Sequence, residues 1–339
     1  MKGIKSIAFQ LILVVILFSA CKRNKLKVDL SKVKKEIEVV QFDKVLLNSS
    51  VRDTLELITH LSTEYPVFFD LFTYRIIHIG GIGEDNFPDL MKLFLSDTLI
   101  REVKAKTDSV FSDRKKLEEQ IKKAFKYYAF HFPDKELPVA YTYISGFNQS
   151  IVTAENIVGI SLDKYLGRDC KYYQQLNTTP QYKVLNMYKE RMIPEMAFAW
   201  AVTEFEDPNS ATNVLDNIIQ KGKMMYMVDA MVPTTHDSLK IGYTTEQLNW
   251  CKMNEAAMWT YLIEKKMLYS NKRMDIIRYV NDAPSTSGFP IESPGRAGVW
   301  IGWQIVRQYM QKHPGVTLKE LMENKEYQQI LNESEYDPG

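Results

Sequence analysis

The longest uninterrupted hydrophobic pattern in the chain lies between Tyr182 and Asp207 and predicts one long helix. Apolar residues recur there at the three- and four-residue spacing that places them on one helical face. From Met192 onward the segment is apolar on almost every side, which is typical of a buried helix. We therefore expect a central helix here, with Pro194 starting or kinking a helical segment because proline lacks a backbone donor.

Short runs of β-branched residues predict a small sheet on the amino-terminal side of that helix. Ile37–Phe42 and Pro138–Ser145 have the composition of single strands. Ser150–Thr153 and Asn156–Leu162 flank a two-residue turn and predict a hairpin. We expect these strands to form a small, mainly antiparallel sheet.

Helical periodicity covers most of the remaining chain and makes the predicted fold α+β, a mostly α-helical single domain. The other predicted helices are Asp53–Leu61, Val67–Ile77, Phe87–Leu95, Asp97–Val110, Asp113–Phe130, Asn213–Met231, Thr245–Leu268, Val299–Lys312 and one or two short helices within 316–333. Gly222 is expected to break the helix in which it lies. Gly298 and Gly302 stand four residues apart and allow another backbone to approach that helix closely.

The amino-terminal residues predict a lipoprotein signal peptide rather than a membrane span. Lys2 and Lys5 precede an apolar stretch of about a dozen residues, which is short for a span. Small residues then lead into Cys21, as in a bacterial lipobox, although Phe18 stands where that pattern usually has leucine. We expect residues 1–20 to be cleaved and Cys21 to carry lipid. An ordinary secretory peptide with a chance cysteine is the alternative.

Charge is unevenly distributed along a chain whose net charge is only +1. Residues 21–35 hold seven lysines and arginines against Asp29, whereas the body beyond them is mildly acidic. This distribution argues against a nucleic-acid binder. We interpret residues 21–36 as a basic tether, either a solvated linker or a segment that touches anionic headgroups beside the lipid anchor. Residues 37–339 then form the globular domain, since the 45% apolar content of the chain suits a sizeable core.

Cysteine usage agrees with an oxidising envelope compartment but does not fix a disulfide. Besides Cys21, the chain holds Cys170 and Cys251, an even pair that could be joined in such a compartment. Two separate free thiols are the alternative.

Glu195 is a carboxylate in the middle of the predicted central helix, among apolar neighbours. A carboxylate in such surroundings is costly unless it is paired or has a function. We therefore expect Glu195 to be buried and paired with a cation, with Lys221 or Arg296 as the candidates. Arg296 could also pair with Glu292, four residues before it, or clamp the carboxylate of a ligand.

A sheet followed by a buried helix with a central glutamate is also the layout of zinc peptidases with an H-E-x-x-H motif. Here the five positions run from Pro194 to Phe198, so the glutamate is present and both histidines are absent. None of the five histidines of the chain lies three to five residues from another. No G-x-S-x-G elbow is present, and nothing among the 42 acidic residues selects a pair for glycoside hydrolysis. The sequence thus predicts no catalytic residue, no metal and no cofactor.

Several motifs together resemble the gliding motility-associated lipoprotein family (GldB) of Bacteroidetes. The most specific is the stretch from Glu292 to Trp303, which has the sequence ESPGRAGVWIGW. The others are the lipobox, Ile160–Gly167, the Pro194 helix, Gly222–Tyr226, Gly242–Thr244 and Asn254-Glu255 with Trp259. The resemblance covers most of residues 37–336.

That family in turn resembles predicted bacterial zinc proteases in which a Glu-Gly pair on the next helix supplies the third ligand. The resemblance implies a zincin-like core helix, with Pro194, Phe198 and Lys221 at the three ligand positions. These side chains cannot hold zinc, and Glu195, as a would-be general base, has no metal-bound water to activate. The resemblance thus implies a degenerate zincin site and a pseudo-protease.

The function implied by the resemblance is that of a non-catalytic cell-envelope lipoprotein associated with gliding or secretion machinery. The expected partners are the membrane, through the lipid on Cys21, and one or more envelope proteins. The expected location is the outer membrane, facing the periplasm. Two alternatives stay open: an unconventional metallopeptidase, and a peptide- or glycan-binding envelope lipoprotein in which Arg296 contacts a carboxylate of the ligand.

Overall fold

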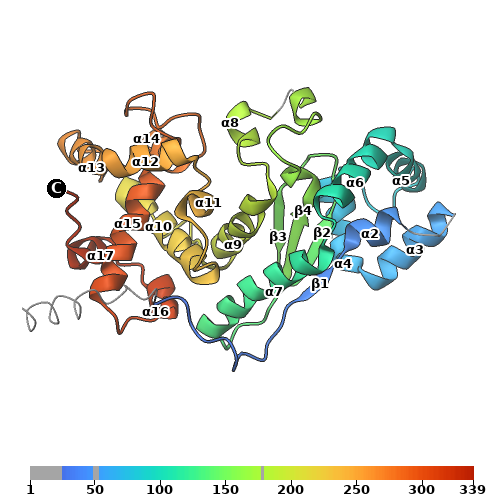
Figure 1. The fold of residues 1–339 in the computed structure, drawn as a ribbon, viewed down its shortest axis with the longest axis horizontal. Coiled ribbons are helices and arrows are strands. Elements are labelled where there is room, and N and C mark those ends of the chain that lie inside the picture. Colours follow the sequence, from blue (N-terminus) through green and yellow to red (C-terminus); the bar gives the residue numbers. More distant parts are fainter. Residues whose placement is uncertain (1–24, 49–52, 177–178) are drawn as a thin grey trace, which may run out of the picture.

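The computed structural model describes residues 25–48, 53–176 and 179–339 (Figure 1). The predicted signal peptide and the predicted lipidation site Cys21 lie outside the described residues. Within these ranges most residues are helical and four short strands form one sheet, so the predicted α+β fold, mostly helical with a small sheet, is confirmed. No helix in the described part of the chain is both long and apolar enough to cross a membrane.

The strands of the sheet lie in the spatial order β1 (Glu38–Val40), β2 (Val139–Tyr143), β4 (Ile157–Ser161) and β3 (Ile151–Ala154). β3 and β4 form the predicted antiparallel hairpin, but β1 pairs with β2, and β2 with β4, in parallel. The expectation of a mainly antiparallel sheet is therefore wrong. Strand patterns identify segments, whereas parallel pairing depends on the crossover that joins two strands. In the described residues, six α-helices and one π-helix lie in the crossover from β1 to β2.

Helices cover both faces of the sheet and build two hydrophobic cores. Tyr141 and Tyr143 face a smaller, aromatic core, while Ala140 and Ile160 face a larger one. The smaller core is closed by α2 (Phe42–Leu47), α3 (Thr54–Glu64), α4 (Pro66–Asp70), the π-helix η1 (Leu71–Ile76) and α5 (Phe87–Ser96). The chain returns to β2 through α6 (Thr98–Val110) and α7 (Arg114–His131).

The predicted central helix is divided in two. A short helix, α8 (Gln181–Val184), is followed by α9 (Lys189–Phe205), which packs against β3 and the next helix. Between them Tyr188 forms an isolated bridge with Leu166, and this pairing interrupts the helical backbone. The one-helix prediction is therefore wrong at its amino-terminal end. Pro194 lies inside α9, which continues through it.

Two long carboxy-terminal helices, α10 (Val214–Met231) and α15 (Ala297–Lys312), cross at glycine contacts. A Cβ atom on Gly302 would lie 1.9 Å from the carbonyl oxygen of Ile218, and one on Gly222 would lie 2.2 Å from that of Gly302. The predicted close approach at Gly302 is confirmed. α10 runs through Gly222 without interruption, so the expected break is wrong, because tertiary packing outweighs the low helix propensity of one glycine.

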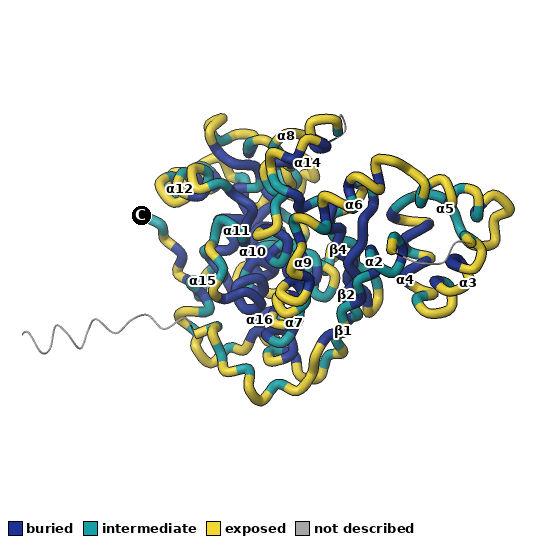
Figure 2. Tube along the Cα trace, turned by 45° about the vertical axis from the view of Figure 1, so that its right-hand side comes forward, coloured by how far each residue is buried: buried dark blue, intermediate teal, exposed yellow. Residues whose placement is uncertain are grey.

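The remaining carboxy-terminal helices surround this crossing, where buried residues are concentrated (Figure 2). They are α11 (Asp237–Ile241), α12 (Thr245–Met253), α13 (Glu255–Glu264), α14 (Arg273–Val280), α16 (Leu318–Glu323) and α17 (Tyr327–Ser334). The single helix predicted over Thr245–Leu268 is wrong, because Asn254 ends α12 and α13 follows directly. Cys170 and Cys251 are buried and free, so the alternative of two separate thiols holds.

Residues 25–36 of the predicted basic tether lie along the body, on the side opposite α8 (Figure 1). Leu26 packs against the larger core. The Lys35 ammonium group donates hydrogen bonds to the carbonyl oxygens of Pro133 at 2.6 Å and Lys135 at 2.9 Å. This basic segment is thus attached to the globular body rather than extended away from it.

Candidate ligand-binding cavity

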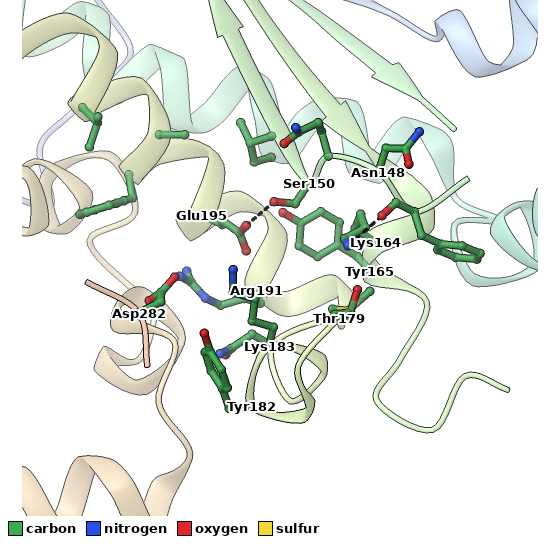
Figure 3. Close-up of a pocket in the computed structure, with 18 of the residues that line it drawn as sticks. Asn148, Ser150, Lys164, Tyr165, Thr179, Tyr182, Lys183, Arg191, Glu195 and Asp282 are labelled. Atoms are coloured by element: carbon green, nitrogen blue, oxygen red, sulfur yellow. Dashed lines mark hydrogen bonds between the residues drawn. The ribbon is translucent and has the colours of Figure 1, made fainter. Parts of the chain in front are cut away.

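A cavity of about 710 Å³ opens between the β3–β4 hairpin, α8, α9 and the loop that precedes α15 (Figure 3). Its wall brings together four residues singled out from the sequence, namely Glu195, Phe198, Lys221 and Arg296. Pro194 is buried within α9 and Glu292 is exposed, and neither lines the cavity. Residues from separate motifs therefore meet at one place, although the ion pairs among them differ from those expected.

Glu195 is half-buried and projects from α9 into this cavity. Its carboxylate accepts a hydrogen bond from the Ser150 hydroxyl at 2.8 Å (Figure 3). The expected ion pair with Lys221 or Arg296 is wrong: Lys221 pairs with Glu206 at 2.7 Å, and Arg296 contacts another acid. Because the carboxylate faces an open space, it does not need the buried cation that its apolar neighbours in the sequence suggested.

Arg191 lies one helical turn before Glu195 on α9 and is only 5% exposed. Its Nη1 donates to the carbonyl oxygens of Leu239 at 2.9 Å and Lys240 at 3.2 Å, at the carboxy-terminal end of α11. Burial lowers the pKa of Arg191, while the nearby charge of Glu195 opposes that shift. The Nε atom of Arg191 is buried without a hydrogen-bond partner in the described part of the chain.

The position of the Arg191 guanidinium depends on a glycine. Gly242, directly after α11, has a φ of 77°, and a Cβ atom there would lie 2.8 Å from Arg191 Nε. Only glycine combines this left-handed conformation with the absence of a side chain. The Gly242–Thr244 motif seen in the sequence therefore makes room for a cation of the cavity.

Arg296 reaches the cavity from a loop held together by hydrogen bonds. The buried Thr286 hydroxyl donates to the Pro294 carbonyl oxygen at 2.7 Å and accepts from the Ala297 N–H at 2.9 Å. Arg296 itself has a φ of 50°, and its side chain contacts Asp282 at 3.3 Å and donates to the Ile241 carbonyl oxygen. The expected pairing of Arg296 with Glu292 is therefore wrong, since the turn at Arg296 directs the side chain toward Asp282.

A buried aspartate arranges the side of the cavity nearest the sheet. Asp163 follows β4 and accepts hydrogen bonds from the N–H groups of Ser145 at 3.2 Å and Phe147 at 2.7 Å. Burial raises the pKa of Asp163, with these hydrogen bonds opposing the shift. Lys164 donates to the Phe147 carbonyl oxygen at 3.0 Å, and burial lowers its pKa. Burial also keeps the next residue, Tyr165, neutral by raising its pKa well above the usual value.

The charge of the cavity wall is predominantly positive. The cationic side chains that line it are Lys164, Lys183, Arg191, Lys221 and Arg296, against the two carboxylates Glu195 and Asp282. Such a surface favours an anionic ligand, whose charge the arginines and lysines can neutralise. Among the described residues, no group of three histidine, cysteine, aspartate or glutamate side chains is placed to hold a metal ion.

Several of these residues were missed from the sequence, although some left a signal. Arg191 stands four residues before Glu195, a spacing that puts both on one helical face. Asp163 stands two residues after the buried strand β4, where a carboxylate needs hydrogen-bond donors. Lys183 and Ser150 gave no such signal, because only the fold brings their segments beside α9.

Comparison with known proteins gives one family match. A family model described as Gliding motility protein GldB matches residues 23–338. No curated protein and no solved structure matches the chain. The family match covers the sheet, every residue of the cavity wall and the helix crossing.

Proposed function

Since the chain belongs to the gliding motility protein GldB family, we propose that it acts in the cell envelope as a lipoprotein that binds a partner without catalysing a reaction. The family supports envelope association and a role connected with gliding motility. We further propose that it is non-catalytic, that it is anchored by lipid and that it lies at the outer membrane. The observation that carries the binding role is the cationic cavity around Glu195.

The absence of catalysis is supported by the residues at the would-be zinc positions. Pro194 and Phe198 carry no ligating atom, and the Lys221 ammonium group is paired with Glu206 at 2.7 Å. Glu195 accepts a hydrogen bond from the Ser150 hydroxyl at 2.8 Å and has no cation paired with it that could replace a metal ion among the ion pairs of the described residues. We therefore regard the fold as a degenerate zincin whose cavity was kept for binding.

The anchoring part of the proposal concerns the amino terminus. Residues 1–20 serve as the signal peptide, Cys21 carries the lipid, residues 21–36 form the basic segment and residues 37–339 form the globular domain. The location is the outer membrane, facing the periplasm. Cys21→Ala should prevent labelling by a palmitate analogue and release the protein from membranes. Equal labelling of the variant and the parent would contradict the lipid anchor.

The decisive experiment on catalysis is an elemental analysis. The protein, purified without a histidine tag and dialysed against trace zinc, should contain far less than one metal ion per chain. It should also leave an unfolded protein substrate intact. Near-stoichiometric metal together with chelator-sensitive cleavage would make the chain an unconventional metallopeptidase and overturn the proposal.

The partner is proposed to be another protein of the envelope. Crosslinking of intact envelopes followed by recovery of this chain should isolate that protein. A variant with a reversed charge at the cavity rim, Lys183→Glu, provides the matched comparison, because Lys183 is exposed and its substitution leaves the core intact. A protein recovered equally well with the variant binds elsewhere on the surface.

A further inference from the structure

We propose that the cavity binds an extended, acidic peptide segment of another protein, which adds to the edge of β3 and places a carboxylate against the cationic wall. This inference rests on the proposed function, because it names the class of ligand that the same cavity takes.

The first support is an unused strand edge beside the cavity. β3 is an outermost strand of the sheet, and the Ser161 N–H donates to the Ser150 carbonyl oxygen at 2.9 Å. Hydrogen-bonded and non-hydrogen-bonded pairs alternate along an antiparallel ladder. With Ile151 opposite Ile160 in the register, the N–H and C=O groups of Ile151 and Thr153 therefore point away from β4.

These outward groups are available to a ligand. Outside the ladder, the described residues give Ile151 and Thr153 no backbone partner, and both residues line the cavity. An unpaired strand edge is a template for another strand, and peptide recognition by strand addition uses such an edge. The N–H and C=O groups of two residues are enough to fix the direction and register of a short extended segment.

The second support is the charge on the far side of the cavity. Lys183, on α8, and Arg191, on α9, lie across the cavity from Ser150 (Figure 3). Lys183 is exposed, while Arg191 is buried. Arg296 adds a third cation that is only partly neutralised by Asp282, at 3.3 Å. A carboxylate of the ligand can reach this group of cations while its backbone follows β3.

The position of Glu195 favours a peptide over other anions. A phosphate ion would meet this carboxylate in the cavity, and like charges repel. The backbone N–H groups of a peptide can donate hydrogen bonds to Glu195, while its acidic side chains contact the cations. An acidic glycan carries carboxylates but lacks the alternating N–H and C=O groups that the edge of β3 requires.

Binding is tested with a fluorescein-labelled hexapeptide that alternates valine and glutamate, added to the detergent-solubilised full-length protein. We expect saturable fluorescence anisotropy that weakens as salt rises, because the attraction is partly electrostatic. A peptide with glutamine in place of glutamate should bind at least tenfold more weakly. The Lys183→Glu variant should show the same loss, whereas Lys115→Glu, an equal charge change at an exposed site on α7, should bind within twofold of the parent.

Strand addition is tested with two further peptides, each methylated on alternate backbone nitrogens. One set should abolish binding, because its N–H groups face β3, and the other set should bind nearly as well as the parent peptide. Equal affinity of the two methylated peptides, or of the glutamate and glutamine peptides, would overturn the inference. So would binding of oligogalacturonate in place of the peptide.

The same experiment separates this inference from the proposed function. Mass spectrometry of the recovered peptide should show it intact. Cleavage would refute the non-catalytic function while leaving the binding site in place. Absence of peptide binding, with no cleavage of any substrate, would refute the inference alone.

Discussion

Two neighbouring residues of α10, Lys221 and Gly222, lie in regions that differ in how tightly they are packed. Gly222 lies at the crossing with α15, where a Cβ atom would approach the Gly302 carbonyl oxygen to 2.2 Å. Lys221, the residue before it, lines a cavity of about 710 Å³ with a mostly cationic wall. The crossing has no room for one additional carbon atom, whereas the cavity leaves room for a ligand.

The difference separates what holds the molecule together from what it can bind. Close-packed backbones tolerate no change of volume, so substitutions at the crossing should reduce stability without a direct effect on binding. Lys183 is exposed and Glu195 half-buried at the cavity wall, so substitutions of these side chains should affect binding more than stability. Substitutions of Gly302, Glu195 and Lys183 test this separation.

The largest effect is expected for Gly302→Val at the crossing. A Cβ atom at this position would lie 1.9 Å from the Ile218 carbonyl oxygen, and the helices must separate to accept it. The free energy of unfolding should fall by about 4 kcal/mol or more, measured by urea denaturation. Gly315→Ala is the control, because a Cβ atom there would have no neighbour within 4 Å. Similar losses for both variants would show that the crossing is not tightly packed.

His131, the last residue of α7, makes the stability of the fold depend on pH. Burial lowers its pKa from 6.5 to about 4. Between these two pH values His131 is therefore protonated in the unfolded chain but mostly neutral in the folded protein. Stability should therefore fall as the pH drops from 6.5 toward 4, by up to about 3 kcal/mol. His131→Gln should flatten this slope in thermal melts recorded across that range. An unchanged slope would assign the pH dependence to other groups.

Glu195→Ala tests how far the cavity contributes to stability. The substitution removes the acceptor of the Ser150 hydroxyl, 2.8 Å away, but it breaks no buried ion pair. We expect the free energy of unfolding to fall by only about 1 kcal/mol. A loss of about 3–5 kcal/mol, as for breaking a buried pair, would show that the carboxylate is held by a buried cation after all.

The smallest effect on stability is expected for Lys183→Ala. The side chain is exposed on α8, and surface substitutions of this kind change stability by no more than about 0.5 kcal/mol. Its effect should appear in binding of the acidic hexapeptide instead. A variant that melts well below the parent would place Lys183 in the packed framework rather than at the rim.

Local patterns predicted the elements well and their arrangement poorly. The hairpin, α7 and α15 follow from periodicity, which depends on residues close together in the chain. The parallel pairing of β2 with β1 and β4 depends on long crossovers, and the interruption before α9 depends on the bridge between Tyr188 and Leu166. These are contacts between distant segments, which a local pattern does not contain.

The residues of the cavity were likewise recognised from the sequence, but their contacts were not. Glu195 and Arg296 were recognised because each is a charged residue in an unusual setting, and the structure places both at one wall. Their partners, Ser150 and Asp282, were not recognised. A sequence shows which charge needs an explanation, but the fold decides which distant residue supplies it.

The attachment of residues 25–36 to the body limits the orientation of the protein relative to a bilayer. With lipid on Cys21, as proposed, four peptide units separate the anchor from Lys25, and an extended chain of that length spans about 14 Å. A connection this short keeps the side of the body that holds residues 25–36 next to the bilayer. α8, which contributes to the cavity wall, lies on the side of the molecule opposite this segment (Figure 1), so with this anchor α8 is turned away from the bilayer. A partner must then approach from the aqueous side, so a segment that projects toward this membrane can be captured, whereas one lying flat on the same leaflet cannot.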